Sequence, residues 1–418
     1  MCILICRLVS LVILLVPSSV LVNAAEEAIG GANVRRANDL AEPVPLIDAD
    51  HPIAAPFVAD MDGDGKPELL VGEFRRDDFS EAGIRIYRPL GKMSDLKFDE
   101  GAWLQADGRD ATVPAFCYTG SAPQVVDFNS DGISDLVSPV PGNQYEFSLR
   151  MFPGLGEGRF GKPTDLPCLN SRHSIPRQTC YNVRTLVYDW DGDGALDILA
   201  SISGGVWVLR HAGNRGANHY AAPEPVVVDG GSLRVALGSL CMADWDGDGR
   251  DDLIVGDALG GVRWYRNTAR RGEPQLAGGL TLVPPGKPDA LEYSQNERFS
   301  RPKEISRSAR VCVADVTGDG RMDLIVGDWV NATAIGPNPT NDQARALKVA
   351  QSQLGVARAA LEKLTGMSPP GGEFRAGYDD ELERRRQECR SLAHTIQQLQ
   401  HHRYERHGSV WLFERLAQ

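Results

Sequence analysis

Five short segments of the sequence place oxygen-bearing side chains at the first, third, fifth and ninth positions of the pattern D-x-[DNT]-x-D-G-x-x-[DE]. Alternate acids over five residues let a tight loop surround a hard cation with several oxygens, and the following glycine permits a sharp turn. The predicted calcium ligands are Asp60, Asp62, Asp64 and Glu68; Asp127, Asn129, Asp131 and Asp135; Asp189, Asp191, Asp193 and Asp197; Asp244, Asp246, Asp248 and Asp252; and Asp315, Thr317, Asp319 and Asp323.

An EF-hand would need a glutamate at the twelfth position and flanking helices. The twelfth position holds Val71, Ser138, Ala200, Val255 or Val326 instead, at the start of apolar, β-branched runs. Eighteen of the 56 acidic residues occupy the predicted ligand positions, and clustered carboxylates repel one another unless a cation neutralises them. We therefore expect up to five calcium ions in β-hairpin loops, with Glu68 and Thr317 the weakest matches to the pattern. Magnesium fits such flexible cages less well.

The acidic segments recur roughly 60 residues apart, and each joins two strand-like runs, which is typical of a repeat architecture. A third strand-like run follows in every unit: GIRIYRP from Gly83, EFSLRMF from Glu146, GVWVLRH from Gly205, GVRWYRN from Gly261 and SVWLFER from Ser409. Four strands recurring at this period describe a propeller blade. The sequence therefore predicts a mainly β protein, a β-propeller of about five blades.

The two ends of the repeat region predict how the ring closes. EPVPLID from Glu42 resembles the fourth strand of a unit, whereas the last unit stops at its third strand, from Ser409 to Arg415. Pairing these two segments completes the last blade and removes two exposed strand edges.

About 80 residues of different character separate the second and third strands of the fifth unit. Apolar residues recur at three- and four-residue steps on both sides of a PPGG turn at Pro369 to Gly372, which predicts an inserted antiparallel coiled-coil hairpin of two helices. The predicted seams are Leu347, Ala350, Leu354, Ala357, Leu361 and Leu364, and Leu382, Cys389, Leu392, Ile396 and Leu399.

The N-terminal residues resemble a secretory signal, with Arg7 before an apolar run and small residues at Ala24 and Ala25. An uncleaved signal anchor is the alternative, and no later stretch is apolar enough to span a bilayer. The expected organisation is a signal peptide over 1–24, a linker over 25–41, propeller blades over 42–340, the helical hairpin over 341–406 and the last propeller strand over 407–418. We thus expect a secreted, periplasmic or cell-surface protein.

The acidic loops, followed by runs such as DLIVGD, resemble the FG-GAP (or VCBS) repeats of integrin α-subunit propellers and of many bacterial secreted proteins. The resemblance covers roughly residues 46–330 and the last strand. It implies a calcium-binding propeller used for adhesion or ligand recognition, with the loop acids as calcium ligands. Five units instead of seven, together with the helical hairpin, depart from the integrin pattern.

Glu73, Asp257 and Asp328 end the second strands of three units, and Trp329 follows the last of them. In an up-and-down blade these strand ends lie on the face opposite the acidic loops, where they could line a ligand site. Strand ends that are solvated, or that hydrogen-bond to adjacent turns, are the alternative interpretation.

No HExxH, G-x-S-x-G or phosphate-binding glycine loop is present, and the net charge of −12 argues against a nucleic-acid partner. We expect a non-catalytic module that binds an extracellular glycan or protein. A calcium-dependent polysaccharide-degrading enzyme and an envelope protein that self-associates through its coiled coil are the alternatives. A Cys168–Cys180 disulfide is expected from the short spacing of these residues, with Cys117–Cys180 as the alternative pair. Cys241 and Cys312 are expected to be small buried residues.

Overall fold

The computed structural model describes residues 40–49, 54–75, 81–91, 95–115, 120–141, 146–169, 183–202, 204–212, 220–270, 272–286, 291–294, 305–335, 340–366, 378–399 and 402–416. They form two compact units, which comprise residues 1–289, 302–330 and 406–418, and residues 290–301 and 331–405. The predicted signal peptide lies outside the described residues. None of the described helices is both long and apolar enough to cross a membrane.

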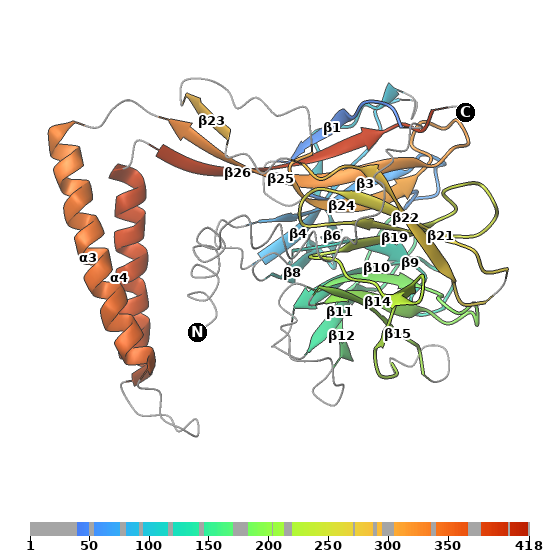
Figure 1. The fold of residues 1–418 in the computed structure, drawn as a ribbon, viewed down its shortest axis with the longest axis horizontal. Helices are drawn as coiled ribbons and strands as arrows, with labels where there is room; N and C mark the ends of the chain where they lie inside the picture. Colours follow the sequence, from blue (N-terminus) through green and yellow to red (C-terminus); the bar gives the residue numbers. More distant parts are fainter. Residues whose placement is uncertain are drawn as a thin grey trace. The chain divides into compact units, whose positions relative to one another are not determined.

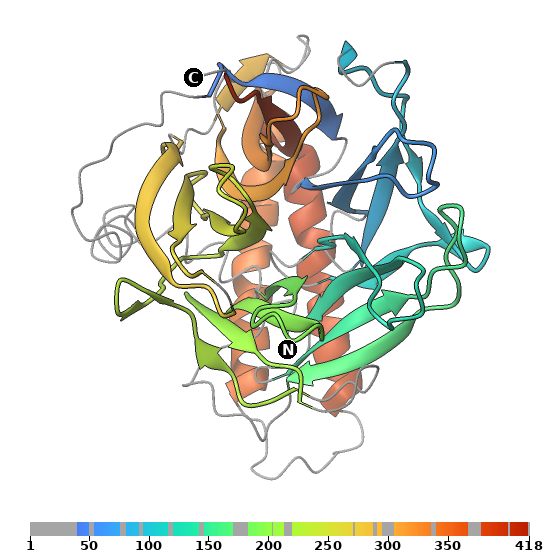
Figure 2. The same cartoon turned by 90° about the vertical axis from the view of Figure 1, so that its right-hand side faces the viewer.

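Five sheets whose successive main strands are antiparallel form the propeller, and they follow one another around a common axis in chain order (Figures 1 and 2). The first blade contains β2 (Ala55–Ala59), β3 (Glu68–Phe74), β4 (Glu81–Tyr87), β5 (Ala102–Trp103) and β8 (Thr112–Pro114), with a small hairpin of β6 (Gln105–Ala106) and β7 (Arg109–Asp110). The second contains β9 (Gln124–Val126), β10 (Asp135–Pro141), β11 (Phe147–Phe152) and β12 (Thr164–Leu169). The prediction of a mainly β, five-bladed propeller is confirmed.

The remaining blades repeat this strand order. The third contains β13 (Arg184–Tyr188), β14 (Asp197–Ile202), β15 (Gly205–Leu209) and β16 (Glu224–Pro225). The fourth contains β19 (Ser239–Ala243), β20 (Asp252–Gly256), β21 (Val262–Asn267) and β22 (Leu276–Val283), extended by β17 (Val227–Val228) and β18 (Gly231–Ser232). The fifth contains β24 (Arg307–Ala314), β25 (Asp323–Ile335), β26 (His402–Phe413) and β1 (Val44–Ala49).

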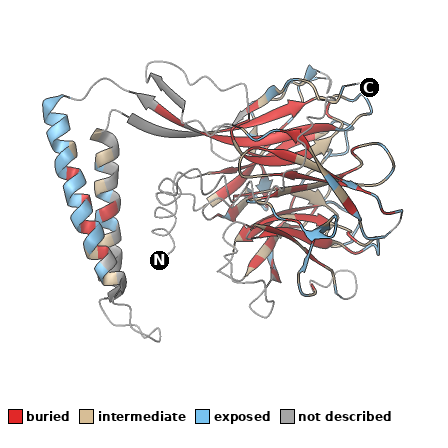
Figure 3. Cartoon of the chain, viewed as in Figure 1, coloured by how far each residue is buried: buried red, intermediate tan, exposed pale blue. Residues whose placement is uncertain are grey.

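The propeller core lies between consecutive blades. Five clusters of buried apolar side chains each combine residues of two neighbouring blades, and one of them joins the fifth blade to the first. Second strands such as β3 and β20 are buried along their whole length (Figure 3) because both of their faces are covered. This double coverage explains why these strands are continuous apolar runs in the sequence. Trp190 and Trp245, at the second position of their loops, belong to these clusters.

Glycines in three second strands allow a close approach of the next blade. A Cβ atom on Gly72 would lie 2.2 Å from the carbonyl oxygen of Ser121, and one on Gly256 would lie 2.5 Å from that of Ala309. At the ring closure a Cβ atom on Gly327 would lie 1.9 Å from the carbonyl oxygen of Ala54. A larger residue at these positions would push two blades apart.

The N-terminal strand completes the last blade, as predicted. β1 pairs antiparallel with β26, with Val44 opposite Leu412 and Ala49 opposite Gly408. The blue strand beside the dark red one in Figure 2 is this pair.

The second unit contains two helices, α3 (Asn341–Gly366) and α4 (Tyr378–Leu399), which pack against each other, and β23 (Leu291–Ser294), which pairs in parallel with β25. Thr340 and Gln343 cap the start of α3 with reciprocal hydrogen bonds between side chain and backbone. Within the predicted seam of α3, Ala350, Leu354, Ala357 and Leu361 are buried. The helices are therefore present, and their coiled-coil character remains a prediction.

The expected Cys168–Cys180 disulfide is wrong, because Cys168 is free; Cys117 and Cys180 lie outside the described residues. Cys168 is a buried free thiol whose Sγ atom lies against the carbonyl oxygen of Leu166. Burial raises the pKa of this thiol to about 12, and the side chain belongs to the core between the second and third blades. Cys241 and Cys312 are free as well, Cys312 buried and Cys241 half-buried.

Candidate metal-binding loops

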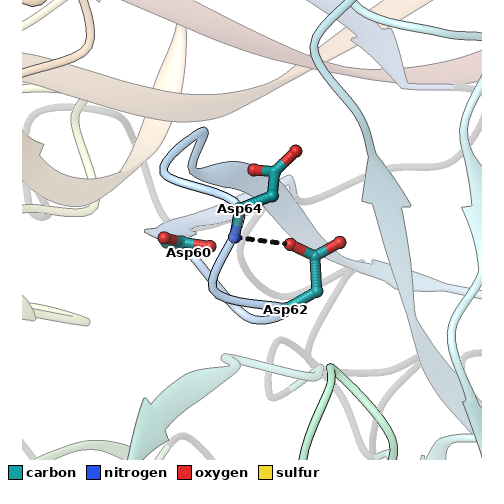
Figure 4. Close-up of side chains that lie close together, drawn as sticks. All are labelled: Asp60, Asp62 and Asp64. Atoms are coloured by element: carbon teal, nitrogen blue, oxygen red, sulfur yellow. Dashed lines mark hydrogen bonds between the residues drawn. The ribbon is translucent and has the colours of Figure 1, made fainter.

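Each acidic segment connects the first strand of a blade to the second, as in the turn between β2 and β3 (Figure 4). Antiparallel strands bring these five loops to the same face of the propeller. In Figure 4 Asp60, Asp62 and Asp64 extend from one tight turn, and the Asp64 N–H donates to Oδ1 of Asp62 at 3.1 Å.

One hydrogen-bond frame recurs in all five loops. Oδ2 of the first aspartate accepts the N–H of the sixth-position glycine at 2.8–3.0 Å, with glycines Gly65, Gly132, Gly194, Gly249 and Gly320. Oδ1 of the fifth-position aspartate accepts the N–H of the seventh residue. These glycines adopt φ between 81° and 86°, a left-handed conformation in which a Cβ atom is strained. The repeated pattern thus fixes carboxylate orientation as well as carboxylate number.

The fourth position of the loops also requires a left-handed backbone conformation. It is a glycine with positive φ in four loops: Gly63, Gly192, Gly247 and Gly318. In the second blade Ser130 takes this place with φ of 61°. A non-glycine residue in this region carries a steric cost of about 1 kcal/mol.

The ninth-position acid joins its loop to the third strand of the same blade. Asp135, Asp197, Asp252 and Asp323 are buried, and Oδ1 of each accepts a backbone N–H from the end of that strand at 2.7–3.0 Å; the donors are Gly154, His211, Asn267 and Arg415. In blade 4 the second oxygen of Asp252 accepts the indole N–H of Trp264 at 2.8 Å. In blades 2, 3 and 5 it accepts backbone N–H groups of the loop.

Burial raises the pKa of these four carboxyls and of Glu68, even though the hydrogen bonds that they accept act in the opposite direction. The sequence predicts these acids as metal ligands and does not reveal that they also connect strands. The sequence signal for that second role was their position at the start of a fully buried strand.

Three loops bring three carboxylates within one coordination sphere. Carboxylate oxygens lie within 4.8 Å of one another for Asp60, Asp62 and Asp64, for Asp189, Asp191 and Asp197, and for Asp244, Asp246 and Asp248. In the second blade Asn129 supplies an amide oxygen, which accepts the Asp131 N–H at 2.9 Å. In the fifth, the Thr317 hydroxyl donates to Asp323.

Basic side chains compensate these acids to different degrees. In the fourth blade Arg266 contacts Asp246 at 2.6 Å and Asp248 at 2.9 Å, and Arg250 also pairs with Asp248. In the others Arg321 pairs with Asp319, Arg210 lies 3.3 Å from Asp191, and Lys66 lies 3.8 Å from Asp64. Sequence reasoning missed these cations, although an arginine follows the loop glycine in blades 4 and 5.

The donor set fits a hard divalent cation. Every predicted ligand offers oxygen, and calcium takes six to eight oxygen ligands from carboxylates, amides, backbone and water. Hydrogen-bonded carboxylate oxygens keep a second lone pair, so the frame leaves the carboxylates able to coordinate. The residues present therefore fit calcium.

The four residues predicted on the opposite face are not brought together as an exposed cluster. Glu73 and Asp328 are 1% and 0% exposed, and Trp329 is buried in a cluster with Phe74 and Ala82. Asp257 is half-buried and accepts the N–H groups of two residues in its own turn at 2.8 and 3.0 Å. Solvated strand ends therefore do not describe Glu73 and Asp328.

Comparison with known proteins agrees with this architecture. A family model described as FG-GAP-like repeat matches residues 189–255 and 244–326, which span the loops of blades 3, 4 and 5. The chain thus carries FG-GAP-like repeats and folds as a five-bladed β-propeller.

No curated protein matches the chain. Thirteen chains of solved structures match it. One is titled "Structural basis of specific recognition of non-reducing terminal N-acetylglucosamine by an Agrocybe aegerita lection"; it shares 18% identity at a TM-score of 0.33 over 67% of this chain and 63% of its own length. This chain therefore spans less than two thirds of that protein, and a likeness of this size carries no conclusion about the ligand.

Proposed function

We propose that the protein is a secreted, calcium-stabilised β-propeller that recognises an extracellular glycan or protein, as an adhesion or ligand-recognition module. The observation that carries the proposal is the recurrence of one hydrogen-bond frame and one set of oxygen donors in five loops, on a scaffold with FG-GAP-like repeats. Secretion rests on the predicted signal peptide over residues 1–24.

Calcium would be held by the acids at positions one, three, five and nine of each loop. When bound, it would supply positive charge that offsets the mutual repulsion of these carboxylates and would stabilise the folded blade. The blades should differ in affinity because Arg250 and Arg266 already neutralise Asp246 and Asp248. We propose that the fourth loop binds calcium more weakly than the third, where Arg210 contacts a single loop acid.

Calorimetric titration of the chelator-treated mature protein tests calcium binding directly. We expect several binding events, a higher melting temperature in calcium, and loss of one event in the double variant D191N/D193N. The matched variant D165N removes an acid outside the loops, on β12, and should keep every event. Absence of binding to the wild-type protein would contradict the calcium part of the proposal.

A glycan and polysaccharide array, probed in calcium and again in chelator, tests recognition. Saturable binding lost in chelator is the expected result. No binding to any glycan under either condition would leave a protein ligand as the remaining class, to be tested with surface extracts and purified matrix proteins.

The polysaccharide-degrading alternative is favoured by one observation: acids at the ends of second strands are withdrawn from water, and burial raises the pKa of Asp257. Perturbed carboxyls of this kind occur in catalytic sites. Release of shorter saccharides from a polysaccharide that the protein binds on the array, and loss of this release in D257N, would support this alternative. Binding without release of shorter saccharides would support recognition.

Self-association through the helices is favoured by exposed apolar residues on α3. Val349 and Val356 are 57% and 71% exposed and lie seven residues apart on one helix face. Light scattering of the wild-type protein and of V349E/V356E tests this alternative, which requires a concentration-dependent oligomer that the variant loses.

A further inference from the structure

Two buried arginines lie on first strands of the propeller. Arg184 begins β13 and Arg310 lies in β24, and each is 3% exposed. First strands contact the first strands of neighbouring blades and surround the propeller axis (Figure 2). Nη2 of Arg184 donates to Oγ of Ser308 at 2.9 Å. This bond joins the third blade to the fifth across the interior of the ring, with the fourth blade between them.

The positive charge of Arg184 has no negative partner among the described residues. Its Nη1 atom is buried and makes no hydrogen bond there. Desolvation lowers its pKa, and the charged group that adds to this effect is Arg310, of like sign. Arginine nevertheless stays protonated in proteins, and an uncompensated buried charge is costly. The Arg184 guanidinium therefore calls for an anion.

The backbone at Ser308 is held in an unusual conformation that presents its hydroxyl to Arg184. Ser308 has φ of 58° and lies in a register shift of β24 between Arg307 and Arg310. The Ser308 N–H donates to the carbonyl oxygen of Ala258 at 3.0 Å, which ties the bulge to the fourth blade. Bulges and strained non-glycine residues concentrate at functional sites.

The acids at the ends of the second strands accept hydrogen bonds from other groups. Oδ2 of Asp328 accepts the Ser306 N–H at 2.9 Å, Asp257 accepts two backbone N–H groups of its own turn, and Glu73 accepts the hydroxyl of Tyr87 at 3.3 Å. None of the three contributes to the pKa shift of Arg184. These three carboxylates therefore do not compensate the charge of Arg184.

We propose that the Arg184 guanidinium and the Ser308 hydroxyl form a binding site for one small inorganic anion inside the propeller ring. The burial of the Arg184 side chain, which is 3% exposed, favours an ion of the size of chloride or sulfate. A guanidinium group donates in parallel to two oxygens of an oxyanion, and the Ser308 hydroxyl can donate its own proton to the ion. The site is independent of the acidic loops, and its ligand has the opposite charge.

The anion content of the purified full-length mature protein tests the site. Protein prepared in chloride or in sulfate is desalted into zwitterionic buffer at fixed calcium and unfolded, and released anions are measured by ion chromatography. We expect an equimolar amount from the wild-type protein and none from R184Q. The control R159Q makes the same charge change at a side chain that is 66% exposed, and it should behave as wild type.

Thermal melts provide the second readout. The melting temperature of wild type and R159Q should rise with anion concentration and saturate, since a ligand that binds the folded state stabilises it, and R184Q should show no saturable rise. If R184Q does not fold, S308A keeps both charges and should weaken the response. Greater stabilisation by sulfate identifies an oxyanion site, and greater stabilisation by chloride a halide site. Absence of both released anion and saturable stabilisation in the wild-type protein would overturn the proposal.

Discussion

The substitution D252A separates the two roles assigned to the ninth-position acid. In the folded protein this carboxylate is fully buried and accepts the Asn267 N–H at 2.7 Å and the Trp264 indole N–H at 2.8 Å. Alanine leaves both donors without their acceptor. A buried donor without a partner costs about 1–3 kcal/mol, and the half-buried indole falls at the lower end because it can reach water. We expect the free energy of unfolding to fall by about 3 kcal/mol.

The measurement is urea denaturation in excess chelator, so that no calcium effect contributes. D246N is the matched control, because Asp246 is a predicted ligand of the same loop that makes no contact with the N–H of Asn267. Loss of its ion pair with Arg266 should cost less than about 1 kcal/mol. Equal destabilisation of D252A and D246N in chelator would refute the structural role of the ninth position.

Three further predictions concern backbone and charge. S130G should raise the free energy of unfolding by about 0.5–1 kcal/mol in urea melts, because glycine adopts the positive φ of that position without steric strain; a lower stability would show that the serine conformation is favourable. G327A should lower the free energy of unfolding by more than about 2 kcal/mol, because its Cβ atom would meet the Ala54 carbonyl and push two blades apart. The control G355A, in α3, meets no other atom and should raise the melting temperature slightly in calorimetry. Burial raises the folded-state pKa of Asp257 above its unfolded value. The stability of the wild type relative to D257N should therefore increase as pH falls through the folded pKa, and this gain should be lost as pH rises through it. Urea midpoints of both proteins over a pH series measure this difference, and a difference that grows with rising pH would contradict the prediction.

The sequence was sufficient for the blade architecture because each second strand is covered on both faces and each loop carries the same glycines. Continuous apolar runs beside regular turns can be recognised in the sequence. The pairing of Glu42–Asp48 with the last strand could also be predicted from it. The buried positions of α3 could be predicted as well, because they follow helical spacing.

The contacts that cross between units of the repeat were not readable. Arg184, for example, reaches Ser308 two blades away. Such pairs depend on the curvature of the ring, which no local pattern encodes. The short spacing of Cys168 and Cys180 predicts a disulfide that does not form, because the Cys168 side chain lies in an apolar core.

The pairing of β1 with β26 has a consequence for the order in which the protein folds. The first four blades draw their main strands from continuous stretches, whereas the fifth needs residues 44–49 together with residues 402–413. Closing so long a loop is slow, because chain entropy opposes contacts between residues far apart in sequence. During synthesis the N-terminal strand must therefore wait, with its edges unpaired, until the remainder of the chain has emerged. The step that makes the ring continuous is the latest and the most exposed to misassembly between neighbouring chains.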